Sequence, residues 1–379
     1  MTDFDAVIDR VGTGSNKWSR YPDDVIPLWV ADMDFAVAPE IIDAIRLRLE
    51  HPVLGYGSAT PELRAAIVER VHSAYGWAIE PEHIVMLPGV EPGFNMALKA
   101  MTRPGDGLIV ATPVYKPILD AASNWSLTRR DVPFIRADDG WAIDFELFEH
   151  QAAQARAFLL CNPQNPTGRV FTRDELERIA EICERHDLFV ISDEIHNELL
   201  FDGRTHIPFG SMNTDAQRRS VTLMAPSKTY NVAGLKTAFA IVTDASVRER
   251  FIASRLGMVD SVNVLGLEAA RAAIVHGGVW RDELIEYLQG NRDYLMREIA
   301  DRLPGIGVIA PEGTFLAWLD CSALRLPVAP AEFFLANAGV ALSVGADFGP
   351  GQDQWVRLNF GCRRALLAQA LDRMVSALS

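Results

Sequence analysis

A lysine and an aspartate stand just behind two short apolar runs that have the length of β-strands. Lys228 follows the run Val221–Met224, and Asp193 follows the run Leu188–Ser192. Burial at a strand end can lower the pKa of a lysine, which makes its amine a nucleophile able to form a Schiff base. A carboxylate at the mouth of a buried strand is costly unless it meets a cation or a donor. Both positions therefore favour chemistry over a surface role.

A possible anion site lies between the apolar run Ile84–Leu87 and a helix that we expect to open at Pro92. The three residues between them are Gly89, Val90 and Glu91, after a proline. Free backbone N–H groups at such a helix start can receive an anion such as a phosphate. Read alone, the segment is better explained as an ordinary turn from a strand to a helix.

Two Asn–Pro steps and a Thr–Gly pair follow the apolar run Ala157–Cys161. Proline restricts the residue before it to extended backbone, and asparagine favours turns. The segment therefore predicts an extended turn that aims the amide of Asn165 inward. Turn formation alone explains any one of these residues, but the combination favours a site.

Other kinds of site are poorly supported. Asp193 and His196 could ligate a metal, yet no H-E-x-x-H motif or third ligand at helical spacing accompanies them. Gly12 and Gly14 lack the third glycine of a dinucleotide fingerprint, because Lys17 stands there. The sequence contains no C-x-x-C pair, which favours reduced thiols over a disulfide or zinc site for Cys161, Cys183, Cys321 and Cys362.

The elements that must position these residues alternate as strands and helices from about residue 80. Uniformly apolar strands suit a sheet that is buried on both faces. A helix is signalled by a capping box of Thr172 and Glu175, followed by apolar residues at helical spacing. This rhythm predicts an α/β fold with a mostly parallel sheet covered by helices. The expected strands are Ile84–Leu87, Leu108–Ala111, Ala157–Cys161, Leu188–Ser192, Val221–Met224 and Ala238–Val242.

The strand–helix rhythm weakens after about residue 275. A long helical pattern over Glu283–Leu303 is followed by strands punctuated by Gly and Pro, and by a last helix near Arg364–Leu378. We expect a large domain over 46–275 and a smaller α+β domain built from 1–45 and 276–379. A length of 379 residues fits two domains.

The overall charge bears on the partners of the protein. Thirty-six basic and 50 acidic residues give a formal net charge of −14, which disfavours binding to nucleic acid. No apolar run approaches the roughly 18 residues that span a bilayer, so we expect no membrane association. The acidic start has no features of a secretion signal, and we expect a cytoplasmic protein.

One cofactor, pyridoxal 5′-phosphate, would use all these strand ends together. It needs a lysine, an acidic partner for its ring nitrogen and a cradle for its phosphate. The chain resembles the fold-type I enzymes that depend on this cofactor, in the class I/II aminotransferase superfamily. More narrowly, it is similar to the MalY/PatB branch of cystathionine β-lyases (C–S lyases). Besides the Asn–Pro turn, the motifs that carry the resemblance are Pro27–Phe35, Ser192–His196, Ser227–Thr229, Thr314–Asp320 and Val356–Cys362.

The resemblance implies a seven-stranded type of sheet in the large, cofactor-binding domain, and it implies roles around the cofactor ring. Lys228 would bind the cofactor covalently and later remove the Cα proton of the substrate. Asp193 would pair with the ring nitrogen, and Asn165 would bind the ring 3′-oxygen with His196 nearby. Tyr115 would stack on the ring, although it could equally be a core residue.

The resemblance also implies how phosphate and substrate are held. The backbone of Gly89, Val90 and Glu91 would bind the phosphate, with the Ser227 hydroxyl close. Lys236 stands where aminotransferases often have arginine, so it would contact the phosphate or lie at the surface.

Two further roles concern the substrate and the assembly. Tyr56 resembles a tyrosine that reaches the phosphate of a neighbouring subunit, which implies a homodimer with shared active sites. Arg357, with Asn165, would bind the substrate α-carboxylate through its forked guanidinium.

The implied reaction is β-elimination from a sulfur-containing L-amino acid. His196 stands where aminotransferases typically have tyrosine, as in the lyase branch. L-cystathionine or a related S-substituted cysteine would give pyruvate, ammonia and a thiol, which is homocysteine from cystathionine. Two alternatives stay open: an aminotransferase with the same cofactor, and a non-catalytic regulatory protein that keeps the cofactor.

Overall fold

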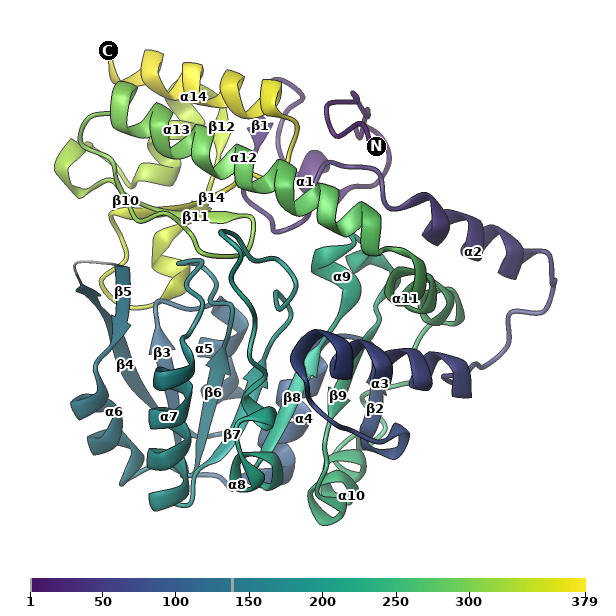
Figure 1. Cartoon of the computed structure of the whole chain (residues 1–379). Helices are drawn as coiled ribbons and strands as arrows, with labels where there is room; N and C mark the ends of the chain where they lie inside the picture. The colour runs from purple at the N-terminus through teal and green to yellow at the C-terminus, as the bar shows by residue number, and fades with distance from the viewer. Residues whose placement is uncertain (1, 138–139) are drawn as a thin grey trace.

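The computed structural model describes residues 2–137 and 140–379, and a wide, twisted sheet forms the centre of its larger part (Figure 1). Eight strands lie in the order β2-β9-β8-β7-β6-β3-β4-β5. Their bounds are β2 Ile84–Leu87, β3 Gly107–Thr112, β4 Thr128–Ala137, β5 Gly140–Ile143, β6 Ala157–Cys161, β7 Phe189–Asp193, β8 Ser220–Met224 and β9 Ala238–Ile241.

The strands from β4 to β8 in this order run parallel, whereas β9 and the edge strand β5 run antiparallel to their neighbours. The predicted α/β fold with a mostly parallel sheet is confirmed. All six expected strands form, with ends within two residues of the prediction. The edge strand β5 widens the sheet beyond the seven-stranded type.

Helices cover both faces of this sheet because its strands are apolar on both sides. In β3, Leu108 and Val110 pack with α4 (Val90–Met101) and α5 (Lys116–Asn124) on one face. Ile109 packs on the other face with α6 (Phe145–Ala152) and α7 (Arg173–Arg185). The predicted capping box of α7 is present, with Thr172 and Glu175 each binding the other's backbone N–H.

A second, four-stranded antiparallel sheet lies over the carboxyl ends of the central strands. Its order is β10 (Gly307–Val308), β11 (Leu316–Asp320), β14 (Trp355–Asn359) and β13 (Ser343–Val344). The helices α12 (Gly278–Arg302), α13 (Pro330–Ala338) and α14 (Arg364–Leu378) pack against it (Figure 1). The last helix has the predicted bounds, and α12 begins five residues earlier than the predicted helical pattern.

The N-terminal segment packs with this C-terminal part of the chain. Strand β1 (Ile26–Pro27) pairs in parallel with β12 (Val340–Ala341). One buried cluster joins Phe4 and Leu28 with residues of α12 and α14. These contacts support the proposed division into 46–275 and a smaller domain of 1–45 with 276–379. Residue 45 itself falls inside α2 (Pro39–Leu49), which packs on α11 (Val264–His276).

The remaining elements complete the helical layers and connections. The α-helices are α1 Asn16–Ser19, α3 Pro61–Tyr75, α8 Thr214–Arg218, α9 Pro226–Thr229 and α10 Ala245–Ala253. Short 3₁₀ turns are η1 Pro81–His83, η2 Phe209–Ser211, η3 Ala233–Leu235, η4 Ser322–Leu324 and η5 Gly345–Phe348. Within the described residues, no helix has both the length and the apolarity needed to cross a bilayer.

Candidate active site

A cavity of about 920 Å³ lies at the carboxyl ends of the central strands, between the two sheets. Ligands of open α/β sheets bind at this edge. The lining includes every predicted site residue except Tyr56, namely Gly89, Val90, Glu91, Tyr115, Asn165, Asp193, His196, Ser227, Lys228, Lys236 and Arg357. Tyr56 is 99% exposed and lies outside this cavity.

Lys228 lies in the one-turn helix α9, directly after β8. Its Nζ donates a hydrogen bond of 2.7 Å to the carbonyl oxygen of Ala31. Burial, with Arg357 adding to it, lowers the pKa of the Lys228 amine to about 8. About a tenth of this amine is therefore neutral and nucleophilic at pH 7, far more than for a lysine with the ordinary pKa.

Asp193 is the last residue of β7 and lies beside Cys161 in the parallel register. Its Oδ1 accepts a hydrogen bond of 3.2 Å from the Ile195 N–H. Burial raises the pKa of this carboxyl to about 7. A buried carboxylate with so few donors gains most from a cationic N–H partner such as a protonated ring nitrogen.

Arg357, on β14, faces the same cavity from the smaller sheet. Its guanidinium donates to Asn165 Oδ1 at 2.9 Å and to the carbonyl oxygen of Trp29 at 2.7 Å. Burial lowers the pKa of Arg357 to about 10, and its buried Nε has no hydrogen-bond partner among the described residues. Arg357 thus keeps donor capacity for an anion.

Two aromatic side chains complete the walls. His196 is buried, and burial holds its pKa well below 6.5, so the ring is neutral; its Nδ1 has no partner among the described residues. Tyr115 is partly exposed, and burial with Glu91 raises its pKa to about 12. The Tyr115 N–H donates to the Asn165 carbonyl at 3.1 Å, which ties two strand ends together.

The predicted anion cradle lies at the start of α4, which begins at Val90 and not at Pro92. The expected helix start was wrong because proline is accommodated throughout the first helical turn, where N–H groups have no internal acceptor. The N–H groups of Val90 and Glu91 lie in that turn, and Gly89 caps it. Lys236, with left-handed backbone, lines the same cavity.

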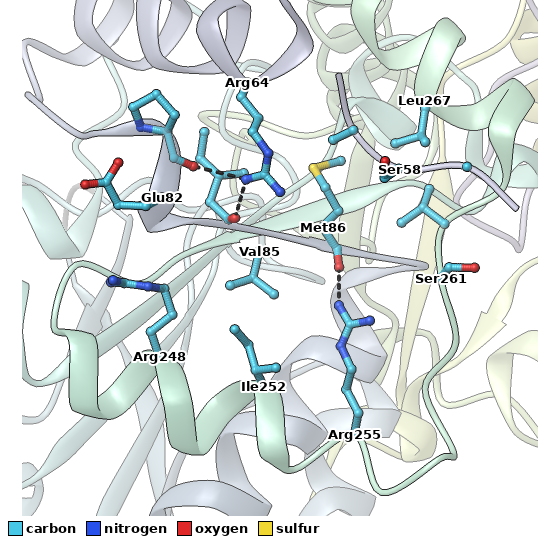
Figure 2. A pocket seen from close by; sticks show the side chains of 15 residues that line it. Ser58, Arg64, Glu82, Val85, Met86, Arg248, Ile252, Arg255, Ser261 and Leu267 are labelled. Atoms are coloured by element: carbon cyan, nitrogen blue, oxygen red, sulfur yellow. Dashed lines mark hydrogen bonds between the residues drawn. The ribbon is translucent and has the colours of Figure 1, made fainter. Parts of the chain in front are cut away.

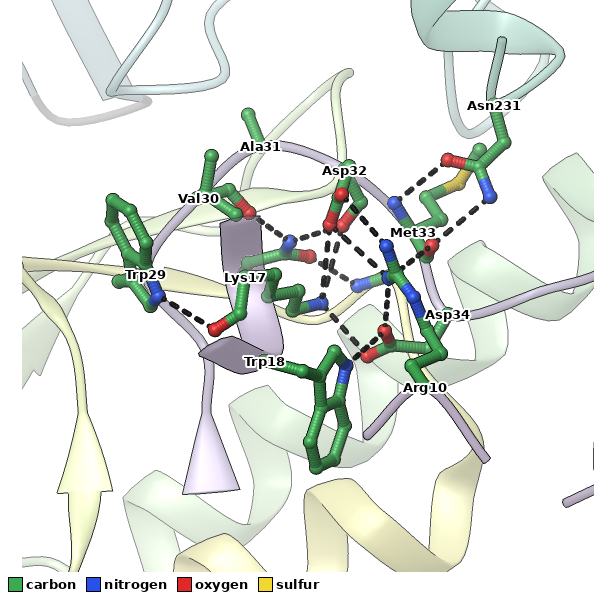
Figure 3. Close-up of polar contacts among 12 residues, drawn as sticks. Arg10, Lys17, Trp18, Trp29, Val30, Ala31, Asp32, Met33, Asp34 and Asn231 are labelled. Carbon is green, nitrogen blue, oxygen red and sulfur yellow. Dashed lines mark hydrogen bonds and ion pairs between the residues drawn. The ribbon is translucent and has the colours of Figure 1, made fainter. Parts of the chain in front are cut away.

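The segment 29–34 forms one wall of the site, with Trp29, Val30 and Ala31 lining the cavity itself, and it was missed as functional by sequence reasoning. Asn359 of β14 donates to the carbonyls of Val30 and Asp32, each at 2.7 Å. Asn231, just after α9, donates to the Met33 carbonyl and accepts from its N–H (Figure 3). The motif Pro27–Phe35 was the available signal, but it did not show that the main-chain carbonyls of this segment would accept the hydrogen bonds that build the site.

A buried ion-pair cluster anchors this wall (Figure 3). Lys17 has no exposed surface, and its Nζ lies 2.7 Å from Asp34 Oδ2. Arg10 binds Asp34 at 2.6 Å and Asp32 at 3.0 Å. Ion pairs shielded from water hold groups in one arrangement when all partners are satisfied. The cluster therefore fixes the position of the wall.

A second cavity, of about 500 Å³, contains none of the predicted site residues. Its three arginines bind main-chain carbonyls: Arg64 those of Pro81 and Ile84, and Arg255 that of Met86 (Figure 2). Arg248 likewise binds two carbonyls. These guanidiniums support loops around β2.

Neither a disulfide nor a metal site is found among the described residues. All four cysteines are free and buried. In the parts of the chain that the structure describes, no three His, Cys, Asp or Glu side chains are grouped to hold a metal ion.

The fold and this cavity define a class of α/β enzymes with a lysine at the end of a central strand. Comparison of the sequence with known families identifies the family. Residues 23–374 match the family Aminotransferase class I and II, so the chain belongs to it. The predicted membership of this superfamily is confirmed.

Relatives within the family agree with the narrower resemblance. The chain is 37% identical to "Cystathionine beta-lyase PatB" of Bacillus subtilis (strain 168), over 99% of this chain and 100% of that protein. Among solved structures, cystalysin from Treponema denticola, described as containing a pyridoxal 5′-phosphate cofactor, has a TM-score of 0.96 at 32% identity, covering 100% and 99% of the two chains. The structure of OvoB has a TM-score of 0.95 at 43% identity, with coverage of 100% and 99%.

Proposed function

We propose that the protein is a pyridoxal-phosphate-dependent C–S β-lyase that cleaves L-cystathionine or related S-substituted L-cysteines. The products are pyruvate, ammonia and a thiol, which is homocysteine from cystathionine. The observation that carries the proposal is the convergence of Lys228, Asp193 and Arg357 on one cavity. The names of the relatives PatB and cystalysin, one a cystathionine β-lyase and the other bound to this cofactor, point to the same activity.

The residues of the cavity fit the cofactor. Lys228 offers an amine of lowered pKa, and Asp193 offers a buried carboxylate that forms no ion pair with any residue the structure describes. The unpartnered Nδ1 of His196 lies in the same lining, and its ring is neutral. The first turn of α4 offers N–H groups to a phosphate. Tyr115 would lie against the ring face, and Asn165 beside its 3′-oxygen.

The residues of this chain would then act in a fixed order on the substrate. Arg357 and Asn165 bind the α-carboxylate and orient the Cα–H bond. When bound, the cofactor supplies a sink for the electron pair left at Cα. The Lys228 amine takes the Cα proton, which its lowered pKa allows near neutral pH. The Cβ–S bond breaks with its electron pair leaving on the thiolate, and hydrolysis of the remaining three-carbon fragment gives pyruvate and ammonia.

The proposal includes a homodimer in which Tyr56 reaches the phosphate site of the partner. Tyr56 does not line the active-site cavity of its own chain and is almost fully exposed, and the neighbouring Val53 and Leu54 are exposed as well. Leu256 and Met258, on another segment, are also exposed apolar residues. Apolar side chains exposed in this way are typical of surfaces that become covered. We further propose that the dimer acts in the cytoplasm, which four unpaired cysteines favour.

The test is the release of pyruvate and thiol from L-cystathionine by the purified protein with added pyridoxal phosphate and no 2-oxo acid. Equal release of both products is expected. No release until a 2-oxo acid is supplied would identify an aminotransferase instead, the second function that the family supports. Full cofactor occupancy without turnover of either kind would indicate a regulatory protein.

A further inference from the structure

Arg20 lies at the wall of the active-site cavity. It follows α1 and lines the active-site cavity together with Tyr21 and Trp29. Its guanidinium lies 4.6 Å from the centre of the Trp29 ring and 5.8 Å from that of Tyr21. Among residues 2–137 and 140–379, no side chain forms an ion pair with it. The cation is therefore stacked in place but not neutralised.

Trp29 connects this cation to the arginine proposed to hold the substrate. The Trp29 indole Nε1 donates to the Lys17 carbonyl at 3.2 Å (Figure 3). The Trp29 carbonyl accepts from Arg357 at 2.7 Å. Lys17 is in turn locked by Asp34. The indole and the carbonyl of Trp29 are thus both held by hydrogen bonds. Trp29 contacts Arg20 through its ring and Arg357 through its carbonyl, and both arginines line the same cavity.

The charge of the cavity differs in sign from that of the whole chain. Five basic side chains line it, against three acidic ones, in a chain of net charge −14. The basic residues are Arg20, Lys116, Lys228, Lys236 and Arg357, and the acidic ones are Glu91, Asp193 and Asp347. A cofactor phosphate and a substrate carboxylate would offset this excess of two, but the residues proposed to hold them do not include Arg20, and Lys116 pairs with Asp120. Arg20 remains for another anion.

We propose that Arg20 binds a carboxylate carried by the sulfur substituent of the substrate. The inference rests on the proposed lyase function and narrows it to S-substituted L-cysteines whose leaving thiol carries an acid group. Arg357 takes the α-carboxylate, and the substituent extends from Cβ along the wall of Tyr21 and Trp29 to Arg20. A planar guanidinium already stacked on an aromatic ring pairs with a carboxylate at little further cost in side-chain freedom.

The kinetic test compares two substrates that differ only at the end of the substituent. S-(2-carboxyethyl)-L-cysteine ends in a carboxylate, and S-propyl-L-cysteine ends in a methyl group. In Arg20→Gln, the ratio of their kcat/KM values should shift about tenfold against the acid, mostly through KM, because one charge-assisted contact is lost. Arg20→Lys should shift it less. Arg173→Gln, on α7 outside the cavity, should leave the ratio unchanged.

A binding experiment separates failure of this inference from failure of the lyase function. Calorimetry of the holoenzyme with pimelate and heptanoate compares a second carboxylate with a methyl group at equal chain length, without any turnover. The wild-type protein should bind pimelate about tenfold more tightly, and Arg20→Gln should abolish this preference. The role of Arg20 as the carboxylate site would be overturned if Arg20→Gln still preferred pimelate over heptanoate, or if the variant lost affinity for both ligands equally. If neither cysteine derivative is cleaved but the preference depends on Arg20, the anion site stands and the lyase function fails.

Discussion

The Nζ of Lys228 and the carbonyl oxygen of Ala31 lie 2.7 Å apart, although 197 residues separate them in the sequence. The contact brings the N-terminal wall against the proposed nucleophile. Asn359 and Asn231 hold the same wall from β14 and from the loop after α9. The reactive amine is thus positioned by three distant parts of the chain.

Replacing Lys228 should abolish turnover. Lys228→Ala removes both the covalent attachment point and the base, and losses of about 10³-fold or more in kcat are expected. Pyruvate release from L-cystathionine at saturating cofactor measures the loss. Lys99→Ala, an exposed lysine on α4, is the matched control and should retain full activity. Substantial activity in Lys228→Ala would remove this residue from the mechanism.

The pKa of Lys228 predicts how the cofactor-free protein captures pyridoxal phosphate. Because the pKa is lowered to about 8, the neutral amine increases about tenfold per pH unit below that value and levels off above it. Stopped-flow absorbance during covalent attachment should show this profile. Nα-acetyl-lysine, with an ordinary amine pKa of about 10.4, provides the comparison and should keep accelerating to higher pH. A protein rate still rising tenfold per unit above pH 9 would contradict the lowered pKa.

Breaking the buried cluster should destabilise the protein. Asp34→Asn leaves the buried Lys17 ammonium with only the more distant Asp32 carboxylate, at 3.8 Å, and should cost about 3 kcal/mol in unfolding free energy. Urea denaturation followed by circular dichroism measures it. Asp43→Asn, in an exposed pair with Arg46, should cost less than about 0.5 kcal/mol. Similar losses in both variants would show that the cluster stabilises no more than a surface pair does.

The same cluster predicts a pH dependence of stability. Burial alone would raise the pKa of Asp34, but Lys17, Trp18 and Arg10 outweigh burial and hold it below 3.8. The folded state therefore binds this proton more weakly than the unfolded state does. The stabilisation is present above the ordinary carboxyl pKa and is lost as the pH falls through the lowered one. In Asp34→Asn this part of the acid sensitivity should disappear.

The proposed homodimer with shared active sites predicts that two inactive variants complement each other in mixed dimers. Tyr56→Ala and Lys228→Ala homodimers should each be impaired. A mixed dimer has one site with both residues intact, so co-refolding equal amounts should recover about a quarter of the wild-type sites. Mixing without refolding is the control. Absence of recovery in isolated mixed dimers would place Tyr56 outside the partner's site.

The sequence predicted the strands, and with them the ends where side-chain chemistry gathers. Asp193 and Lys228 are recognisable because a charged residue behind an apolar run is unusual. The carbonyls of Trp29 and Ala31 were not predictable as ligands, since every residue carries one and only the tertiary fold selects among them. Strands β4 and β5 were missed because neither is a uniformly apolar run: β4 opens with Thr-Arg-Arg-Asp, and β5 is four residues long and only partly buried.

The pairing of β1 with β12 has a consequence for synthesis of the protein. The segment around Trp29 and Ala31 takes its final position only against Val340–Ala341 and Asn359, which are translated more than 300 residues later. A growing chain can form its central sheet and expose Lys228 before that wall exists. The complete site therefore requires a chain translated beyond residue 359, and truncation before that residue should leave Lys228 in place without the wall that surrounds its amine.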